Sequence, residues 1–138
     1  MISNELENLV RIGQLKREAT NNSELEGLQR SGEARLRDAG NKKLALESRF
    51  DLAYNAAHAL ALAALRRLGL RSDNRYVVFQ SLPHTLGVDT PVWRLLAKCH
   101  GLRNQAEYEG MLEVDERLVD DLVDAVKVVN KALQAATT

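Results

Sequence analysis

The stretch AAHALALAAL, residues 56–65, dictates the architecture of this chain, because it is apolar on nearly every side when it is read as a helix. A helix without a polar face packs against several neighbours at once. The stretch lies within residues 42–68, the best-defined helical pattern of the sequence, and Gly69 is placed to end that pattern. We therefore expect residues 42–68 to form the central helix of a bundle.

Capping residues predict two helices before the central one. Ser3 is placed to cap a first helix over residues 4–18. Ser23 and Glu26 form a capping box that opens a second helix, and Gly40 is placed to end it. Both segments carry apolar residues at the spacing of one helical face, so each is predicted to be amphipathic.

The second helix carries a glycine on its apolar stripe. Gly32 permits close approach of another backbone, but it lowers helix propensity by about 1 kcal/mol relative to alanine. The two N-terminal helices also have little apolar area to bury. We therefore expect residues 1–41 to form an N-terminal helical hairpin that is mobile or depends on a partner.

Residues 76–79, YVVF, have the composition of a strand. A lone strand is unstable, however, and the sequence offers no second β-rich run to pair with it. We therefore predict a short helix here, capped by Asp73 or Asn74 and bent or ended near Pro83.

Two longer helices complete the predicted bundle. Thr90 and Pro91 combine a capping residue with the proline favoured at the first helical position, and Gly110 ends that region. Asp115 opens the last helix, whose apolar face comprises Leu118, Val119, Leu122, Val126, Val129 and Leu133. The chain is therefore predicted to be all-α, a single domain over residues 1–138 with five or six helices and short connections.

Composition and charge disfavour membrane and nucleic-acid proteins. The 138 residues contain 19 basic and 19 acidic side chains, so no net field attracts the chain to nucleic acid or to an anionic membrane. The longest apolar run, residues 59–65, is far shorter than a membrane span. Neither a signal sequence nor a cysteine pair is visible, since Cys99 is the single cysteine. We expect a cytoplasmic protein.

The histidines do not predict a metal site. His58, His84 and His100 lack a metal-ligand spacing, and no glycine-rich loop follows a strand, so we expect neither a metal nor a cofactor. His58 lies inside the apolar helix and is interpreted as a core histidine. Cys99 is interpreted as an inert packing residue.

Four arginines gather around the end of the central helix. They are Arg66, Arg67, Arg71 and Arg75. Basic side chains are favoured at a helix C-terminus, which explains such a group structurally, whereas a phosphate-binding role is the functional alternative.

The segment WRLLAKCHGLRNQAEYEG, residues 93–110, sorts into three helical faces instead of two. Its core stripe comprises Val92, Leu95, Cys99, Leu102 and Ala106, and its solvated side Arg94, Lys98 and Gln105. A third stripe lies at the edge of the apolar face and comprises His100, Arg103, Asn104 and Glu107, below Trp93 and Leu96. Polar groups at a core boundary lose hydration unless they are paired. The stripe is interpreted as an interface or a site. The alternative is a row of polar residues that only caps the core.

The segment RFDLAYNAAHALALAALRRLGLR, residues 49–71, together with RNQAEYEG, residues 103–110, resembles the HEPN superfamily of helical bundles. The resemblance covers about residues 42–133 and implies a HEPN-like four-helix core after the N-terminal hairpin. Arg103 and Asn104 match the arginine and following polar residue of a motif that ends in histidine four to six residues later. In catalytic members, these groups meet across a dimer interface and cleave RNA without metal, with the histidine suited to proton transfer.

The sequence departs from this motif, because Tyr108 stands where the resemblance implies a histidine. A phenol is a poor general base at neutral pH, although it can donate a proton or bind a phosphate oxygen. His100, one helical turn before Arg103, is a possible substitute. We expect Arg103, Asn104, Glu107 and Tyr108 to form one hydrogen-bonded cluster, with Trp93, Leu96 and His100 at an interface.

Three functions follow from these observations. The resemblance implies a binding or regulatory component of a toxin–antitoxin or phage-defence module, paired with a nucleotidyltransferase-type protein and without activity of its own. The first alternative is a metal-independent HEPN ribonuclease that uses Arg103, Asn104 and Tyr108. The second is a helical domain whose polar stripe only builds a homodimer. A homodimer or a heteromer with a cognate partner is expected, with RNA as a possible ligand.

Overall fold

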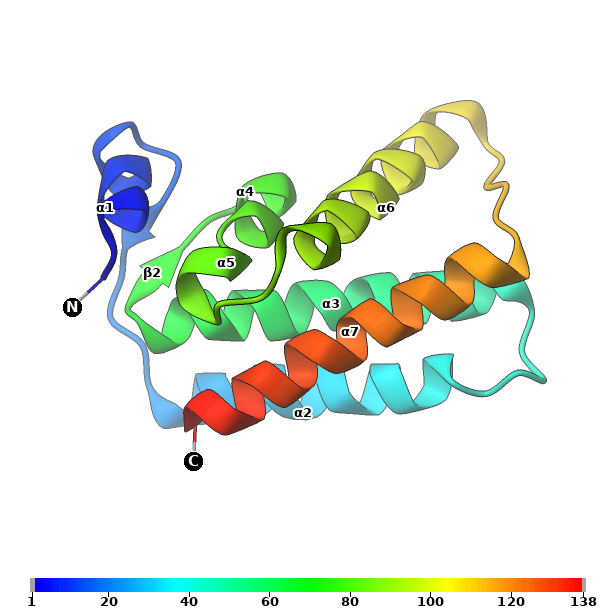
Figure 1. Ribbon diagram of the computed structural model, residues 1–138, viewed down its shortest axis with the longest axis horizontal. Helices are drawn as coiled ribbons and strands as arrows, with labels where there is room; N and C mark the ends of the chain where they lie inside the picture. Colours follow the sequence, from blue (N-terminus) through cyan, green and yellow to red (C-terminus); the bar gives the residue numbers. More distant parts are fainter. Residues whose placement is uncertain (1, 138) are drawn as a thin grey trace.

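The computed structural model describes residues 2–137 as a helical bundle with a two-stranded sheet at one end (Figure 1). The all-α class predicted from the sequence is confirmed for this part of the chain. In chain order the elements are α1 (Asn4–Arg11), β1 (Lys16–Arg17), α2 (Asn22–Ala39), α3 (Leu46–Arg67), β2 (Leu70–Arg71), α4 (Arg75–Gln80), α5 (Leu82–Thr85), α6 (Thr90–Glu109) and α7 (Glu116–Thr137).

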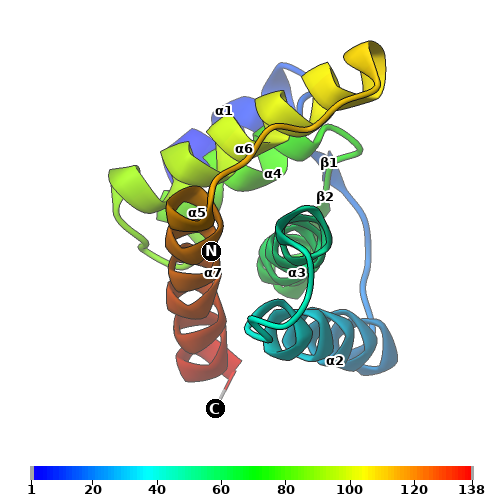
Figure 2. The same ribbon diagram turned by 90° about the vertical axis from the view of Figure 1, so that its right-hand side faces the viewer.

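Helix α3 is the central helix, as predicted. It contacts α2, α4, α5, α6 and α7. Helix α2 lies along it, whereas α7 crosses it obliquely and ends beside α2 (Figures 1 and 2). Within residues 56–65 only His58, Ala59 and Leu62 are not fully buried. Gly69 ends the region with a left-handed backbone (φ 75°), which an L side chain rarely adopts. Among residues 2–137, none of the helices has the length and apolarity that a bilayer span requires.

The first helix is shorter than predicted. Ser3 caps it, accepting a hydrogen bond from the Leu6 N–H at 3.2 Å. It ends at Arg11 instead of residue 18, because Gly13 adopts a left-handed conformation (φ 81°) that turns the chain away. Strand β1 then pairs antiparallel with β2 and joins this end of the chain to the segment after α3.

The predicted N-terminal hairpin is wrong. Helix α2 packs along α3 and belongs to the bundle, whereas α1 lies at the far end beside the strands (Figure 1). The capping box is also wrong, since Asn21, not Ser23, caps α2 by accepting from the Glu24 N–H at 2.8 Å. Gly40 does end α2, as predicted.

Gly32 lies where α2 packs tightly against α3. A Cβ atom at this position would lie 2.6 Å from Cγ of the buried Leu60. We expect Gly32→Ala to lower the free energy of unfolding by about 1–3 kcal/mol, because overpacking outweighs the gain in helix propensity. Gly27→Ala, on the same helix with no atom within 4 Å of the added Cβ, should raise it by about 0.5–1 kcal/mol. Urea denaturation of both variants checks this pair, and a stabilised Gly32→Ala variant would contradict the close contact.

The second half of the chain follows most of the predicted boundaries. YVVF is helical, and Asn74 caps α4 by accepting from the Val77 N–H at 3.3 Å. The chain bends after α4, and Pro83 lies in the first turn of the short helix α5. Thr90 is the first residue of α6 and Asp89 its cap, so the predicted cap is one residue late. Gly110 (φ 77°) ends α6 as predicted.

Helix α7 starts where the sequence predicts. The Asp115 carboxylate accepts from the Leu118 N–H at 2.8 Å and so caps the helix. The predicted apolar face is buried at Val119, Leu122, Val126, Val129 and Leu133, and Leu118 packs against the core from a half-buried position.

Of the four arginines near the end of α3, only Arg66 and Arg71 share partners. Arg66 is buried, and its guanidinium donates to the Glu24 carboxylate and to the carbonyls of Glu18, Ala19 and Leu70. Arg71 pairs with Glu18 and Glu24, Arg67 donates to the Thr85 carbonyl, and Arg75 turns toward the middle of α3. Of the two interpretations, the structural one accounts for Arg66 and Arg71.

Candidate functional site

Two polar stripes meet where α6 crosses α3. His100, Arg103, Asn104 and Glu107 on α6 stand at positions i, i+3, i+4 and i+7. The same spacing recurs on α3 with Asp51, Tyr54, Asn55 and His58. The contacts Asp51–Arg103 and Tyr54–His100 run in opposite directions along the two helices. We call these eight residues, with Arg75 of α4, the polar seam.

Arg103 is held by the seam from three sides. Its guanidinium forms a close ion pair with Asp51 and lies 3.6 Å from the Glu107 carboxylate. The same group lies over the Tyr54 ring, 5.6 Å from the centroid, in a cation–π arrangement. The Arg103 side chain is 27% exposed. Arg103 is therefore oriented by two carboxylates, which also balance its charge.

Both ring nitrogens of His100 have polar neighbours. Nδ1 lies 2.7 Å from the Tyr54 hydroxyl, and Nε2 lies 3.2 Å from the Asn104 amide nitrogen. A neutral imidazole has one donor and one acceptor nitrogen, so these two neighbours match its capacity. Burial lowers the pKa of His100, and the positive Arg75 lowers it further, while Glu107 acts in the opposite direction. His100 is therefore neutral and oriented at pH 7.

Aromatic packing anchors the seam to the core. Tyr54 is buried, stacks on Phe50 and His100, and meets Phe79 edge-on. Arg75 lies over the same ring at 5.4 Å and donates to the Asn55 side chain at 3.3 Å. Two guanidinium groups thus contact one tyrosine ring, which concentrates positive charge at this point of the seam.

His58 ends the α3 stripe on its buried side. Its ring meets Phe79 edge-on, with 6.3 Å between the centroids. Burial, together with Arg75 and His100, lowers the pKa of His58 to about 4. The sequence interpretation of His58 as a core histidine holds only in part, because the ring packs against Phe79 but is half-buried.

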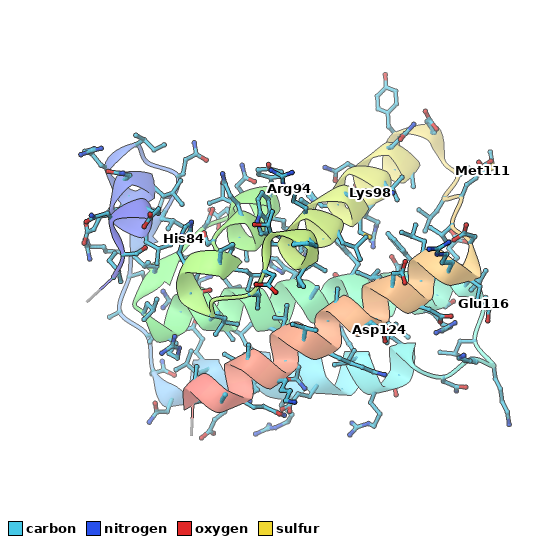
Figure 3. The ribbon with its side chains drawn as sticks, in the orientation of Figure 1. His84, Arg94, Lys98, Met111, Glu116 and Asp124 are labelled. Carbon is cyan, nitrogen blue, oxygen red and sulfur yellow. The ribbon has the colours of Figure 1, made fainter. Side chains whose placement is uncertain are left out.

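Two predicted interface residues make contacts within the chain. Leu96 is only 1% exposed and belongs to the core, so its place in the predicted interface is wrong. Trp93 is half-buried and meets Tyr76 of α4 edge-on, with Arg94 over its ring. Cys99 is buried as predicted, and burial raises the pKa of its thiol to about 11. Arg94 and Lys98 lie on the exposed side of α6 (Figure 3).

Tyr108 does not join the predicted cluster. Its side chain is 94% exposed, and five helical positions place it about 140° around α6 from Arg103. Glu107 does contact Arg103, whereas Asn104 contacts His100 instead. The predicted four-residue cluster is therefore wrong for Tyr108, and Arg103 meets Asp51 and Tyr54 in its place.

The α3 half of the seam was missing from the sequence predictions. The signal was present, because Asp51, Tyr54, Asn55 and His58 share the spacing that identified the α6 stripe. These four residues lie in or beside an alanine-rich segment, and its apolar residues obscure the polar spacing. Arg75 comes from a different helix, so no spacing in the sequence links it to Tyr54.

The polar side chains of the seam are suited to binding polar groups of another molecule. Among residues 2–137, no group of three or more histidine, cysteine or carboxylate side chains is arranged to hold a metal ion. The seam offers guanidinium, imidazole, amide and carboxylate groups along one edge, with Asn104 and Glu107 exposed. Comparison with family models, with curated proteins and with solved structures finds no match to this chain.

Proposed function

We propose that this chain is a HEPN-like binding or regulatory component of a toxin–antitoxin or phage-defence module, and that the polar seam contacts its partner. The nucleotidyltransferase-type identity of that partner follows from the HEPN resemblance. The observation that carries the proposal is the seam itself. The segments that carry the resemblance, residues 49–71 and 103–110, contact each other through Asp51 and Arg103.

The charges of the seam support binding over RNA cleavage. A catalytic arginine must be free to bind a phosphodiester, but Arg103 already lies against the Asp51 and Glu107 carboxylates. These carboxylates repel an incoming phosphate. Tyr108 is far around the helix from Arg103, so one chain does not bring the two matched motif positions together. A protein surface, which has both hydrogen-bond donors and acceptors, therefore matches the mixed charges of the seam better than a phosphodiester does.

Half-buried Trp93 and the exposed ends of Asn104 and Glu107 lie along the same side of α6 as His100. Tryptophan and arginine are frequent anchors of protein interfaces. We therefore place the homodimer or heteromer contact along this edge. The alternative function, a helical domain that only forms a homodimer, would use the same edge but would bind a second copy of this chain instead of another protein.

Arg103→Ala should abolish co-purification with the protein encoded by the adjacent gene, while thermal stability changes little. Partly exposed ion pairs contribute only about 0–1 kcal/mol, so the loss of Arg103 affects orientation more than folding. Co-expression, affinity capture and differential scanning calorimetry give both readouts. Lys98→Ala, on the exposed side of the same helix and away from Trp93, is the matched control and should bind like the wild type. Equal capture of the Arg103→Ala variant would contradict the proposal.

The ribonuclease alternative is favoured by one observation, the neutral His100 one turn from Arg103. The same purified proteins, incubated with total RNA and a chelator, separate the two functions. We expect no cleavage by the wild type. Cleavage that disappears in both Arg103→Ala and His100→Gln would show that the chain is a metal-independent nuclease, and would overturn the binding proposal.

A further inference from the structure

The free end of α6 and the loop to α7 form a groove beside the seam. Two shallow depressions, of about 240 Å³ and about 290 Å³, share the three residues Ala106, Met111 and Leu112. The first also reaches Leu102 and Gln105, and the second runs back toward Arg103. We call the two together the α6–α7 groove. Figure 3 shows Met111 at the end of the molecule that carries this loop.

Apolar side chains line part of the groove and are anchored in the core. Leu102 and Leu112 pack against the hydrophobic core, so the floor is continuous with the interior of the bundle. Met111 remains 63% exposed beside them. An unbranched thioether adapts its shape to different apolar partners, which is why methionine recurs at binding surfaces for helices.

The rim of the groove is strongly acidic. Residues 105–124 contain eight carboxylates and one arginine. Glu109 and Glu113 line the first depression and Glu107 the second, where Arg103 is paired with both Asp51 and Glu107. The rim therefore presents carboxylates whose charge the rest of the chain leaves largely uncompensated.

The position of these carboxylates on α6 is unfavourable in the isolated chain. Glu107 and Glu109 lie in the last turn of α6, where the helix dipole is negative and basic side chains are favoured. The last turn of α6 contains no basic residue. A cationic partner would relieve this like-charge arrangement, whereas nucleic acid or an anionic membrane would be repelled.

We propose that the α6–α7 groove binds a basic amphipathic helix of a partner protein. Two large apolar side chains about one turn apart on that helix enter the two depressions, and its lysine or arginine side chains contact Glu107, Glu109 and Glu113. The inference rests on the proposed function, since it gives the chemistry of the partner that the function requires.

A designed peptide tests the groove in the full-length chain. The probe is a labelled 18-residue peptide with leucines at positions i, i+3, i+4 and i+7 and lysines elsewhere. Its charge-reversed twin carries glutamates in place of the lysines. Fluorescence anisotropy should show saturable binding of the basic peptide, weakened by salt, and at least tenfold weaker binding of the twin. Equal binding of the two peptides would overturn the proposal.

Variants locate the binding. Met111→Ser combined with Glu109→Lys should weaken binding of the basic peptide at least tenfold. The matched control combines Ile12→Ser with Glu26→Lys, because Ile12, just after α1, is equally exposed at 64%, and Glu26 is an exposed carboxylate on α2. The control should bind within twofold of the wild type. Equal losses in both double variants would show nonspecific attraction and overturn the proposal.

The seam and the groove respond oppositely to one substitution. Arg103→Ala removes a positive charge from the second depression, so it should maintain or strengthen binding of the basic peptide while it abolishes capture of the cognate protein. If Arg103→Ala abolishes that capture and the Met111→Ser, Glu109→Lys variant captures the protein normally, the proposed function stands and the groove inference fails. If neither substitution affects capture, the proposed function fails as well.

Discussion

Arg66→Ala is expected to lower the free energy of unfolding by about 3 kcal/mol, although Arg66 is a charged residue outside the candidate site. The side chain is 1% exposed, and its guanidinium donates hydrogen bonds to the carbonyls of Glu18, Ala19 and Leu70. It also donates to the Glu24 carboxylate. Removing it leaves these acceptors short of donors, at a cost of about 1–3 kcal/mol for each buried group that water does not reach. It also disconnects β1 and the start of α2 from the end of α3.

Urea denaturation followed by circular dichroism measures this loss. Arg67→Ala is the neighbouring control, because Arg67 donates a hydrogen bond to the Thr85 carbonyl, and the variant should lose about 1 kcal/mol or less. Arg66→Lys should fall between the two, since an ammonium group keeps the charge but lacks the planar fork that reaches several acceptors. An Arg66→Ala variant as stable as Arg67→Ala would show that the hydrogen bonds of Arg66 do not stabilise the fold as predicted.

Local signals in the sequence predicted the helices, and nonlocal contacts explain the errors. The caps Ser3 and Asp115 and the terminating glycines Gly69 and Gly110 act within a few residues of their own positions, and each has its predicted role. The hairpin failed because the partner of α2 is α3, and no pattern within residues 1–41 contains that information. Gly32 illustrates the point, because the residue interpreted as weakening α2 is the one that admits Leu60.

The site shows the same division. The α6 stripe was predicted from its spacing, and His100, Arg103 and Glu107 do meet other groups of the seam. Leu96 was assigned to the interface although it lies close to the apolar face, and packing buries it. Tyr108 was included because it is five residues after Arg103, the distance implied by a motif. On one helix, a spacing of five residues places the two side chains on different faces. A match to a motif in the sequence therefore does not show that its residues lie together.

Acidification should destabilise the chain between about pH 6.5 and pH 4 through His58. Burial lowers the pKa of His58 from its ordinary 6.5 to about 4, with Arg75 and His100 acting in the same direction. The unfolded chain therefore takes up the proton first, so the neutral ring favours the folded state fully above pH 6.5, and that advantage is lost as the pH falls through this window. A shift of this size corresponds to about 3 kcal/mol. The lowered pKa of His100 adds to the loss.

Chemical denaturation at half-unit intervals from pH 8 to pH 4 measures this dependence. His58→Gln should flatten the decline, because the substituted side chain does not titrate. The pKa of Glu24 is lowered, chiefly by its hydrogen bond to Arg66, so the contribution of Glu24 is lost only below about pH 4.5. The two windows therefore overlap little. A His58→Gln variant that declines as steeply as the wild type between pH 6.5 and pH 5 would show that His58 is not the group responsible for the loss of stability.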